Sequence, residues 1–119
     1  MNRARTGSQG EALAAEWYTA NGYDICAKNY RARAGEVDLI VQKDGLLAFV
    51  EVKTRAEGGI ALPREWVDAR KQRRIVAAAL DFLEKHCRQE PWMRFDVVEV
   101  TLYGNGGHKI HCIENAFSV

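Results

Sequence analysis

The sequence predicts a single α/β domain, residues 1–119, in which two helices flank a mixed five-stranded sheet in the order α-β-β-β-α-β-β. Three observations predict this class. The chain of 119 residues has room for one core. Its hydrophobic content of 47% and charged content of 28% are those of an ordinary globular protein. Two segments with helical spacing of apolar residues are interspersed with five runs that have strand character. A two-domain enzyme and a disordered chain are therefore excluded.

The first helix is predicted over residues 11–21, EALAAEWYTAN. Its apolar stripe consists of Leu13, Ala14, Trp17 and Tyr18. Thr6 or Ser8 can cap its start, and Gly22 can end it. Tyr23 to Asn29 alternate weakly between apolar and polar residues, which predicts a first strand followed by the basic loop NYRARAG.

A β-hairpin is predicted next. The runs GEVDLIVQ and LLAFVEVK have strand character and are separated by Lys43, Asp44 and Gly45. An Asp-Gly pair between two such runs is the strongest short-range hairpin signal. A second helix is predicted from about Glu65 to His86, where apolar residues keep helical spacing. The runs RFDVVEVTLY and HKIHCIENAF then form the last two strands around a GNGG turn.

Net charge, cysteine content and the lack of long apolar stretches indicate the compartment in which the protein acts. Lys and Arg number 17 against 16 Asp and Glu, so the formal net charge is +1 and any attraction to nucleic acid must come from local clusters. The 3 cysteines are widely spaced and odd in number, which favours a reducing cytoplasm. No stretch approaches the ~20 apolar residues of a membrane span. The first ten residues also lack the apolar segment of a secretory signal. The sequence therefore predicts a cytoplasmic protein.

The hairpin brings charged residues together. A two-residue Asp44-Gly45 turn pairs positions whose numbers sum to 89, which places Asp38 opposite Glu51 and Glu36 opposite Lys53. Because side chains alternate, these four residues share one face. The other face is apolar and pairs Val37 with Val52, Leu39 with Val50, and Val41 with Ala48. A three-residue loop with a bulge would shift the pairing by one.

Two facing carboxylates predict a cation site. Such a pair is destabilising unless a cation bridges it or one group is protonated. Oxygen ligands suit Mg²⁺ or Mn²⁺, which also bind water and phosphate oxygens. Lys53 could orient or deprotonate an attacking water or stabilise charge on a phosphate. These are the parts of a phosphodiesterase. The alternative is a solvated sheet face on which Glu36 and Lys53 form a cross-strand ion pair.

The motif GEVDLI, residues 35–40, followed by FVEVKTR, residues 49–55, resembles the core of PD-(D/E)XK nucleases. The whole chain resembles the YraN-like family of uncharacterised proteins, predicted endonucleases distantly similar to archaeal Holliday junction resolvases. Further points of resemblance are Gly10-Glu11, Lys71, the run RFDVV at 94–98 and the terminal NAF at 115–117.

The resemblance implies a restriction-endonuclease-like fold with an active site on the hairpin. It implies Asp38 and Glu51 as metal ligands, the Val52 carbonyl as a third ligand and Lys53 as the catalytic lysine. Glu11 would complete the site from the first helix. Resolvase-like relatives also imply a homodimer.

Basic residues surround the predicted acidic centre. Arg70, Lys71 and Arg74 cluster near the start of the second helix and could bind phosphates. The alternative for this cluster is a solvated helix face. Three further arginines flank the hairpin in sequence: Arg31, Arg33 and Arg55. A basic rim around an acidic centre suits a polyanion bound through a metal.

Together these features predict a Mg²⁺- or Mn²⁺-dependent endonuclease acting on DNA. A chain this short has few loops to read a sequence, so structure-selective or nonspecific cleavage is expected. The alternative is a non-catalytic nucleic-acid-binding or accessory protein that retains the motif. The two differ in metal dependence, because only the enzyme needs a divalent ion for turnover.

Overall fold

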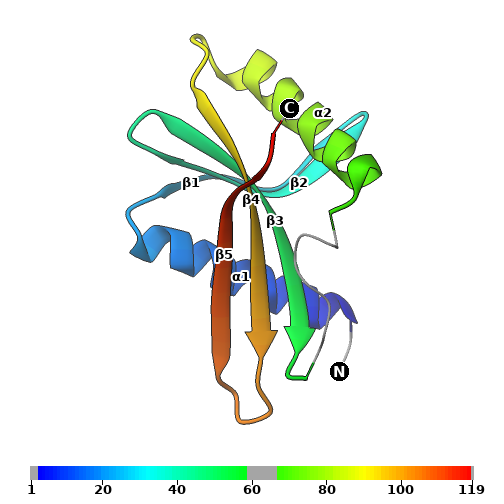
Figure 1. The fold of residues 1–119 in the computed structure, drawn as a ribbon. Coiled ribbons are helices and arrows are strands. Elements are labelled where there is room, and N and C mark those ends of the chain that lie inside the picture. Colours follow the sequence, from blue (N-terminus) through cyan, green and yellow to red (C-terminus); the bar gives the residue numbers. More distant parts are fainter. Residues whose placement is uncertain (1–2, 59–66, 119) are drawn as a thin grey trace.

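The structure is a computed structural model that describes residues 3–58 and 67–118. Seven elements follow one another along the chain (Figure 1): α1 (Arg3–Ala20), β1 (Asp24–Ala32), β2 (Gly35–Lys43), β3 (Leu46–Ala56), α2 (Ala69–His86), β4 (Trp92–Leu102) and β5 (His108–Phe117). The predicted order of helices and strands is confirmed.

The five strands form one mixed sheet in the spatial order β1-β2-β3-β4-β5. β3 and β4 run parallel and pair over their whole lengths, from Leu46 with Trp92 to Ala56 with Leu102. The other neighbouring strands are antiparallel. A parallel pair needs a crossover connection, and the segment that contains α2 supplies it.

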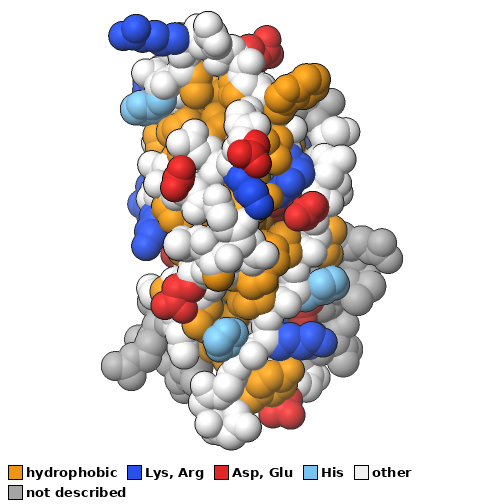
Figure 2. Space-filling view, turned by 90° about the vertical axis from the view of Figure 1, so that its left-hand side faces the viewer, with side chains coloured by type: hydrophobic (Ala, Val, Ile, Leu, Met, Phe, Trp, Pro, Cys, Tyr) orange, Lys and Arg blue, Asp and Glu red, His pale blue; other side chains and the backbone are white. Residues whose placement is uncertain are grey.

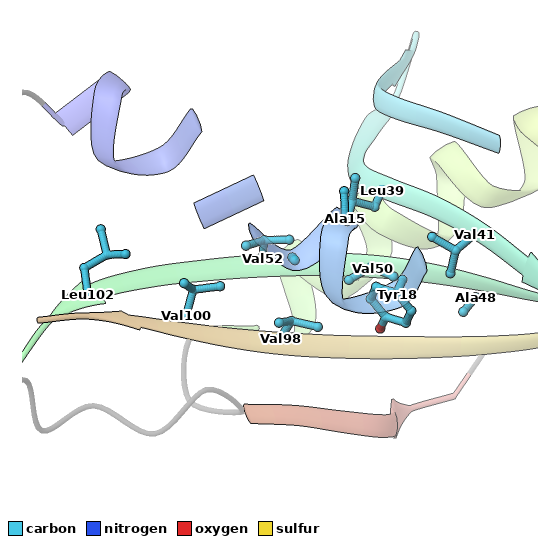
Figure 3. Packing of buried hydrophobic residues seen from close by; sticks show 11 residues of the cluster. Ala15, Tyr18, Leu39, Val41, Ala48, Val50, Val52, Val98, Val100 and Leu102 are labelled. Atoms are coloured by element: carbon cyan, nitrogen blue, oxygen red, sulfur yellow. The ribbon is translucent and has the colours of Figure 1, made fainter. Parts of the chain in front are cut away.

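The two helices cover opposite faces of the sheet. Side chains alternate along β3, so Val50 and Val52 pack with Ala14 and Tyr18 of α1, whereas Phe49 packs on the side of α2. Figure 3 shows how the valines of β3 and β4 meet α1. β3 is thus buried on both faces, which explains its nearly continuous apolar sequence.

The first helix begins earlier than predicted. α1 starts at Arg3, so positions 6 and 8 lie inside the helix and not at its N-cap. Nothing in the segment RARTGSQG forbids helical backbone, and the helix therefore continues beyond the potential capping residues. The predicted end is confirmed, because Gly22 has a positive φ of 88° directly after the helix.

β1 is longer than predicted and takes in part of the expected basic loop. Its pairing with β2 continues to Ala32 opposite Gly35, so Arg31 lies in the strand and only Arg33 and Ala34 form the turn. Backbone pairing with β2 outweighs the polar character of these residues.

The second helix begins later than predicted. Glu65 lies outside the described residues, but Val67 and Asp68 are described and are not helical. Asp68 is the N-cap, and its side chain accepts a hydrogen bond of 2.9 Å from the backbone N–H of Lys71. Among the helices that the structure describes, none is long and apolar enough to cross a membrane.

Candidate active site

The hairpin between β2 and β3 has the predicted turn and register. Asp44 and Gly45 have positive φ angles of 49° and 80°, as a type I′ turn requires. The ladder pairs Lys43 with Leu46 and continues in step to Leu39 with Val50. The sequence prediction is therefore correct over this part of the hairpin.

Beyond Leu39 and Val50 the predicted pairing fails. In the ladder as predicted, Val52 would exchange hydrogen bonds with Val37, but Val37 belongs to the cluster beneath α2. Instead the Val52 N–H donates to Oδ2 of Asp38 at 2.7 Å. The part of β2 before Leu39 pairs only with β1. The Asp38 side chain therefore accepts the hydrogen bond that the backbone of β2 would have accepted from β3.

The predicted contact between Glu36 and Lys53 is also wrong. Glu36 is exposed, and its carboxylate lies 3.8 Å from the guanidinium of Arg31 on β1. Lys53 instead pairs with Glu51 on its own strand. The separation of the two strands explains both changes, because Glu36 pairs through its backbone with β1 and Lys53 pairs with β4.

Glu51 is the centre of the charged cluster. Its side chain is only 6% exposed, and its Oε1 lies 2.6 Å from Nζ of Lys71 and 3.2 Å from Nζ of Lys53. Lys71 comes from the first turn of α2, where the Asp68 cap fixes its backbone. Strand and helix therefore each place one ammonium group on the same carboxylate oxygen.

Asp38, unlike Glu51, has no lysine within ion-pair distance among the described residues. Burial raises the pKa of Asp38 to about 7, and the negative charges of Glu51 and Glu11 act in the same direction. The hydrogen bond from Val52 and the charge of Lys71 partly oppose this rise. A proton or a cation beside Asp38 is therefore favoured.

The two lysines respond differently to the cluster. Burial lowers the pKa of Lys53, and the neighbouring Lys71 lowers it further, against the attraction of Glu51. Burial also disfavours the charged form of Lys71. Its hydrogen bond to Glu51 and the charges of Glu51 and Asp38 outweigh that effect and raise the pKa of Lys71. Lys71 therefore stays protonated to higher pH than Lys53, which gives up its proton more readily.

Glu11 reaches the cluster from α1 because Gly10 lets the helix approach β3. A Cβ on Gly10 would lie 1.7 Å from Oγ1 of Thr54, so a larger residue would force the helix away. Glu11 is close enough for its charge to raise the pKa of Asp38. The structure therefore brings together Asp38, Glu51, Lys53 and Lys71 from three elements, and Glu11 of α1 acts on Asp38 through its charge.

The donor set fits a hard divalent cation. Asp38 and Glu51 are neighbouring carboxylates, and Asp38 favours a positive neighbour. In a strand the N–H and C=O of one residue point to the same edge. The Val52 carbonyl therefore points, like its N–H, toward Asp38. Across the described residues, no three His, Cys, Asp or Glu side chains group to hold a metal. Two carboxylates, a carbonyl, water and phosphate oxygens are a set that Mg²⁺ accepts.

Four of the other basic residues that the sequence predicted for phosphate binding lie on the surface. Arg70 and Arg74 are exposed on α2, and Arg33 is exposed in the turn between β1 and β2. Arg31 is exposed and paired with Glu36. On the face shown in Figure 2, acidic and basic side chains are interspersed and no extended basic patch gathers. Because the formal net charge is only +1, attraction to a polyanion would depend on local groups of basic residues.

Arg55 and Glu99 form a partly buried pair that sequence reasoning missed. Arg55 Nε donates to Oε1 of Glu99, whose side chain is 6% exposed. Glu99 lies on β4 in register with Lys53. Arg55 therefore contacts an acid inside the protein, whereas the sequence predicted it on a basic rim. A glutamate between valines in the run VVEVT was the only signal for this site.

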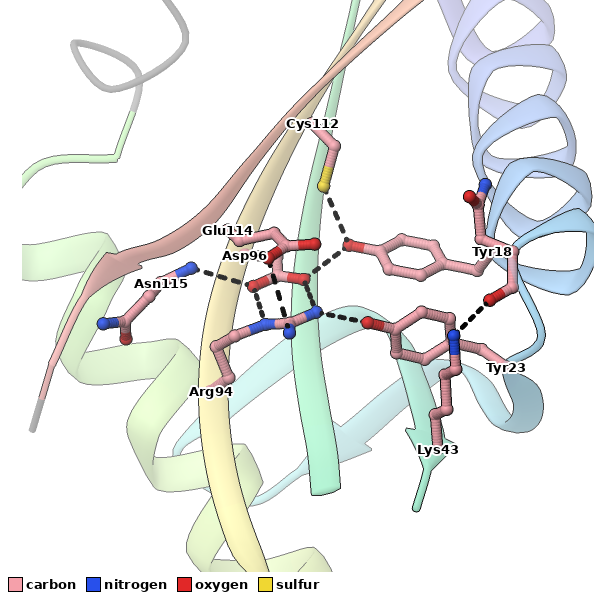
Figure 4. A network of polar contacts seen from close by, with 9 residues as sticks. Tyr18, Tyr23, Lys43, Arg94, Asp96, Cys112, Glu114 and Asn115 are labelled. Carbon is pink, nitrogen blue, oxygen red and sulfur yellow. Dashed lines mark hydrogen bonds and ion pairs between the residues drawn. The ribbon is translucent and has the colours of Figure 1, made fainter. Parts of the chain in front are cut away.

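Asp96 has a structural role. It is fully buried and accepts hydrogen bonds from Tyr18 at 2.8 Å and from the Asn115 N–H at 3.0 Å. Arg94 donates to both carboxylate oxygens, at 2.8 and 2.9 Å, and also to the Tyr23 hydroxyl at 2.9 Å. Figure 4 shows that this network joins α1, β4 and β5.

Comparison with known proteins places the chain in a family. The model described as "Uncharacterised protein family UPF0102" matches residues 10–100, which include the hairpin and Lys71. A UPF0102 protein of Symbiobacterium thermophilum is 48% identical over 113 residues, covering 95% of this chain and 96% of the relative. One of Anaeromyxobacter dehalogenans is 44% identical over 115 residues, 97% of this chain and 85% of the relative. One of Caldicellulosiruptor bescii is 41% identical over 119 residues, 98% of this chain and 100% of the relative. The chain therefore belongs to the UPF0102 family.

Proposed function

We propose that this protein is a divalent-metal-dependent endonuclease that hydrolyses DNA phosphodiesters. The observation that carries the proposal is the grouping of Asp38, Glu51 and Lys53 where β2 separates from β3. The resemblance of GEVDLI and FVEVKTR to PD-(D/E)XK nucleases supports it. Asp38, Glu51 and the Val52 carbonyl would hold Mg²⁺ or Mn²⁺. Such an ion, when bound, polarises a phosphate oxygen and acidifies water.

The side chains of the cluster have separate tasks in this proposal. Lys53 is half-buried beside Glu51 and has a lowered pKa, so it can orient the attacking water or exchange a proton with it. Lys71 contributes positive charge next to the scissile phosphate. Glu11 adds a third carboxylate from the α1 side. Both carboxylate ligands lie on a rigid sheet, which keeps them in place during the reaction.

The substrate is expected to be selected by its shape. Of the connections that the structure describes, three are hairpin turns of only a few residues, at 33–34, 44–45 and 103–107. Short turns offer little surface for reading base edges. Structure-selective or nonspecific binding through phosphates is therefore proposed, in the cytoplasm and with a homodimer as the active form.

A non-catalytic nucleic-acid-binding protein is the second candidate. The observation that favours it is the double ion pair on Glu51, which satisfies this acid without any metal. A panel of linear, branched and single-stranded DNA, incubated with Mn²⁺ or with EDTA, separates the two. The nuclease cuts at least one substrate only with Mn²⁺. A binding protein retains DNA equally in both buffers and cuts none.

Phosphate binding is expected to depend on the exposed cations of α2. Changing Arg70 and Arg74 together to Gln should weaken DNA binding for every sequence, because each loses a phosphate contact. The slope of log affinity against log salt should flatten by about two units. Fluorescence anisotropy in EDTA measures the DNA affinity at each salt concentration without cleavage of the DNA. Arg88→Gln with Lys109→Gln, which removes two exposed charges elsewhere, is the matched control. An unchanged slope would mean that Arg70 and Arg74 do not contact phosphates, and Arg31 and Arg33 would be the next candidates.

A further inference from the structure

One oxygen of Glu51 carries two ammonium groups. Its Oε1 lies 2.6 Å from Nζ of Lys71 and 3.2 Å from Nζ of Lys53. The shorter contact is a charge-assisted hydrogen bond of full strength. It also crosses from α2 to β3, so it is a tertiary contact that the helix position maintains. Because Glu51 is only 6% exposed, Lys71 and Lys53 together keep its buried charge paired.

A divalent ion bound to Oε1 of Glu51 cannot coexist with this contact. Mg²⁺ binds carboxylate oxygens at about 2.1 Å. An ammonium nitrogen on the same oxygen would then lie within a few ångströms of the ion, and the two positive charges would repel strongly in a half-buried site. The Lys71 side chain is 37% exposed, so it can swing outward from Glu51.

We propose that Lys71 is a built-in competitor for the metal: it neutralises Glu51 in the metal-free protein and must leave that oxygen for the ion to bind. This inference rests on the proposed metal site at Asp38 and Glu51. Lys53 makes the longer contact with this oxygen, 3.2 Å, from the same strand as Glu51, whereas Lys71 makes the shorter contact, 2.6 Å, from the opposing helix. Lys71 therefore lowers the affinity for metal while keeping the empty site stable.

The test is a calorimetric Mn²⁺ titration of the full chain in metal-free buffer. Lys71→Met removes the competing cation and should bind Mn²⁺ about tenfold more tightly than the parent, the effect expected of one charge-assisted hydrogen bond. Lys71→Gln, which keeps a polar group beside Glu51, should shift in the same direction. Lys109→Met removes an exposed charge on β5 and serves as the control for net charge. Its affinity should equal that of the parent.

The outcomes separate this inference from the proposed function. If the parent binds Mn²⁺ and both Lys71 variants bind it equally or more weakly, competition is wrong although the metal site stands. If only the Lys71 variants bind, competition is supported in its strongest form. If neither parent nor variants bind, the metal site itself is wrong and the inference falls with it. An equal gain in Lys109→Met would assign the effect to net charge and overturn the competition.

Discussion

Replacing Lys53 with Met is expected to lower Mn²⁺-dependent DNA cleavage by at least about a hundredfold. Lys53 has the lowered pKa of the two lysines and lies 3.2 Å from Glu51, where it can act on water or phosphate. Asp38 and Glu51 are unchanged in this variant, so Mn²⁺ should still bind. The comparison requires initial cleavage rates at saturating Mn²⁺ and a Mn²⁺ titration of the same preparation.

The exposed Lys28 on β1 provides a matched control for this experiment. Lys28→Met removes the same charge and should cut at the parental rate. Unchanged cleavage in Lys53→Met would exclude Lys53 from the chemistry. Loss of Mn²⁺ binding together with cleavage would instead make Lys53 a residue that shapes the metal site.

Replacing Asp96 with Ala is expected to reduce the free energy of unfolding by about 3–5 kcal/mol. The change leaves the guanidinium of Arg94, whose side chain is only 15% exposed, without its buried counterion. It also removes the acceptor for the Tyr18 hydroxyl and for the Asn115 N–H. Urea denaturation of parent and variant measures the loss.

A double variant distinguishes a lost ion pair from lost packing. Asp96→Leu with Arg94→Met replaces both charges by apolar groups of similar size, and it should recover much of the stability lost in Asp96→Ala. A loss below about 1 kcal/mol in Asp96→Ala would mean that the network of Figure 4 is not a major support of the fold.

The hairpin was predictable because its signal is local. Asp44 and Gly45 adopt the positive φ angles that their residue types favour, and this turn fixes the register as far as Leu39 and Val50. The point at which the strands separate lies beyond the reach of the turn, where β2 pairs with β1 and packs against α2. The hydrogen bond from Val52 to Asp38 could therefore not be read from the turn.

In the candidate site too, local sequence signals predict some contacts and not those that depend on packing between distant elements. Hairpin geometry brings Asp38 and Glu51 near each other, and alternation places Lys53 on the side of Glu51. The 2.6 Å contact of Lys71 with Glu51 depends on how α2 crosses the sheet, although the family resemblance had singled out Lys71. The Arg55–Glu99 pair depends on the parallel register of β3 and β4, which no local turn specifies.

The central claim is that Asp38 and Glu51 form a divalent-metal site. Its most direct test is a calorimetric titration of Mn²⁺ into the parent protein and into Asp38→Asn, which keeps the side-chain shape and removes one negative ligand. We expect saturable binding of Mn²⁺ by the parent and affinity reduced by at least about tenfold in the variant. Equal binding by the parent and Asp38→Asn, or no binding by the parent and by Lys71→Met alike, would contradict the claim and leave Asp38 with a structural role at the Val52 N–H.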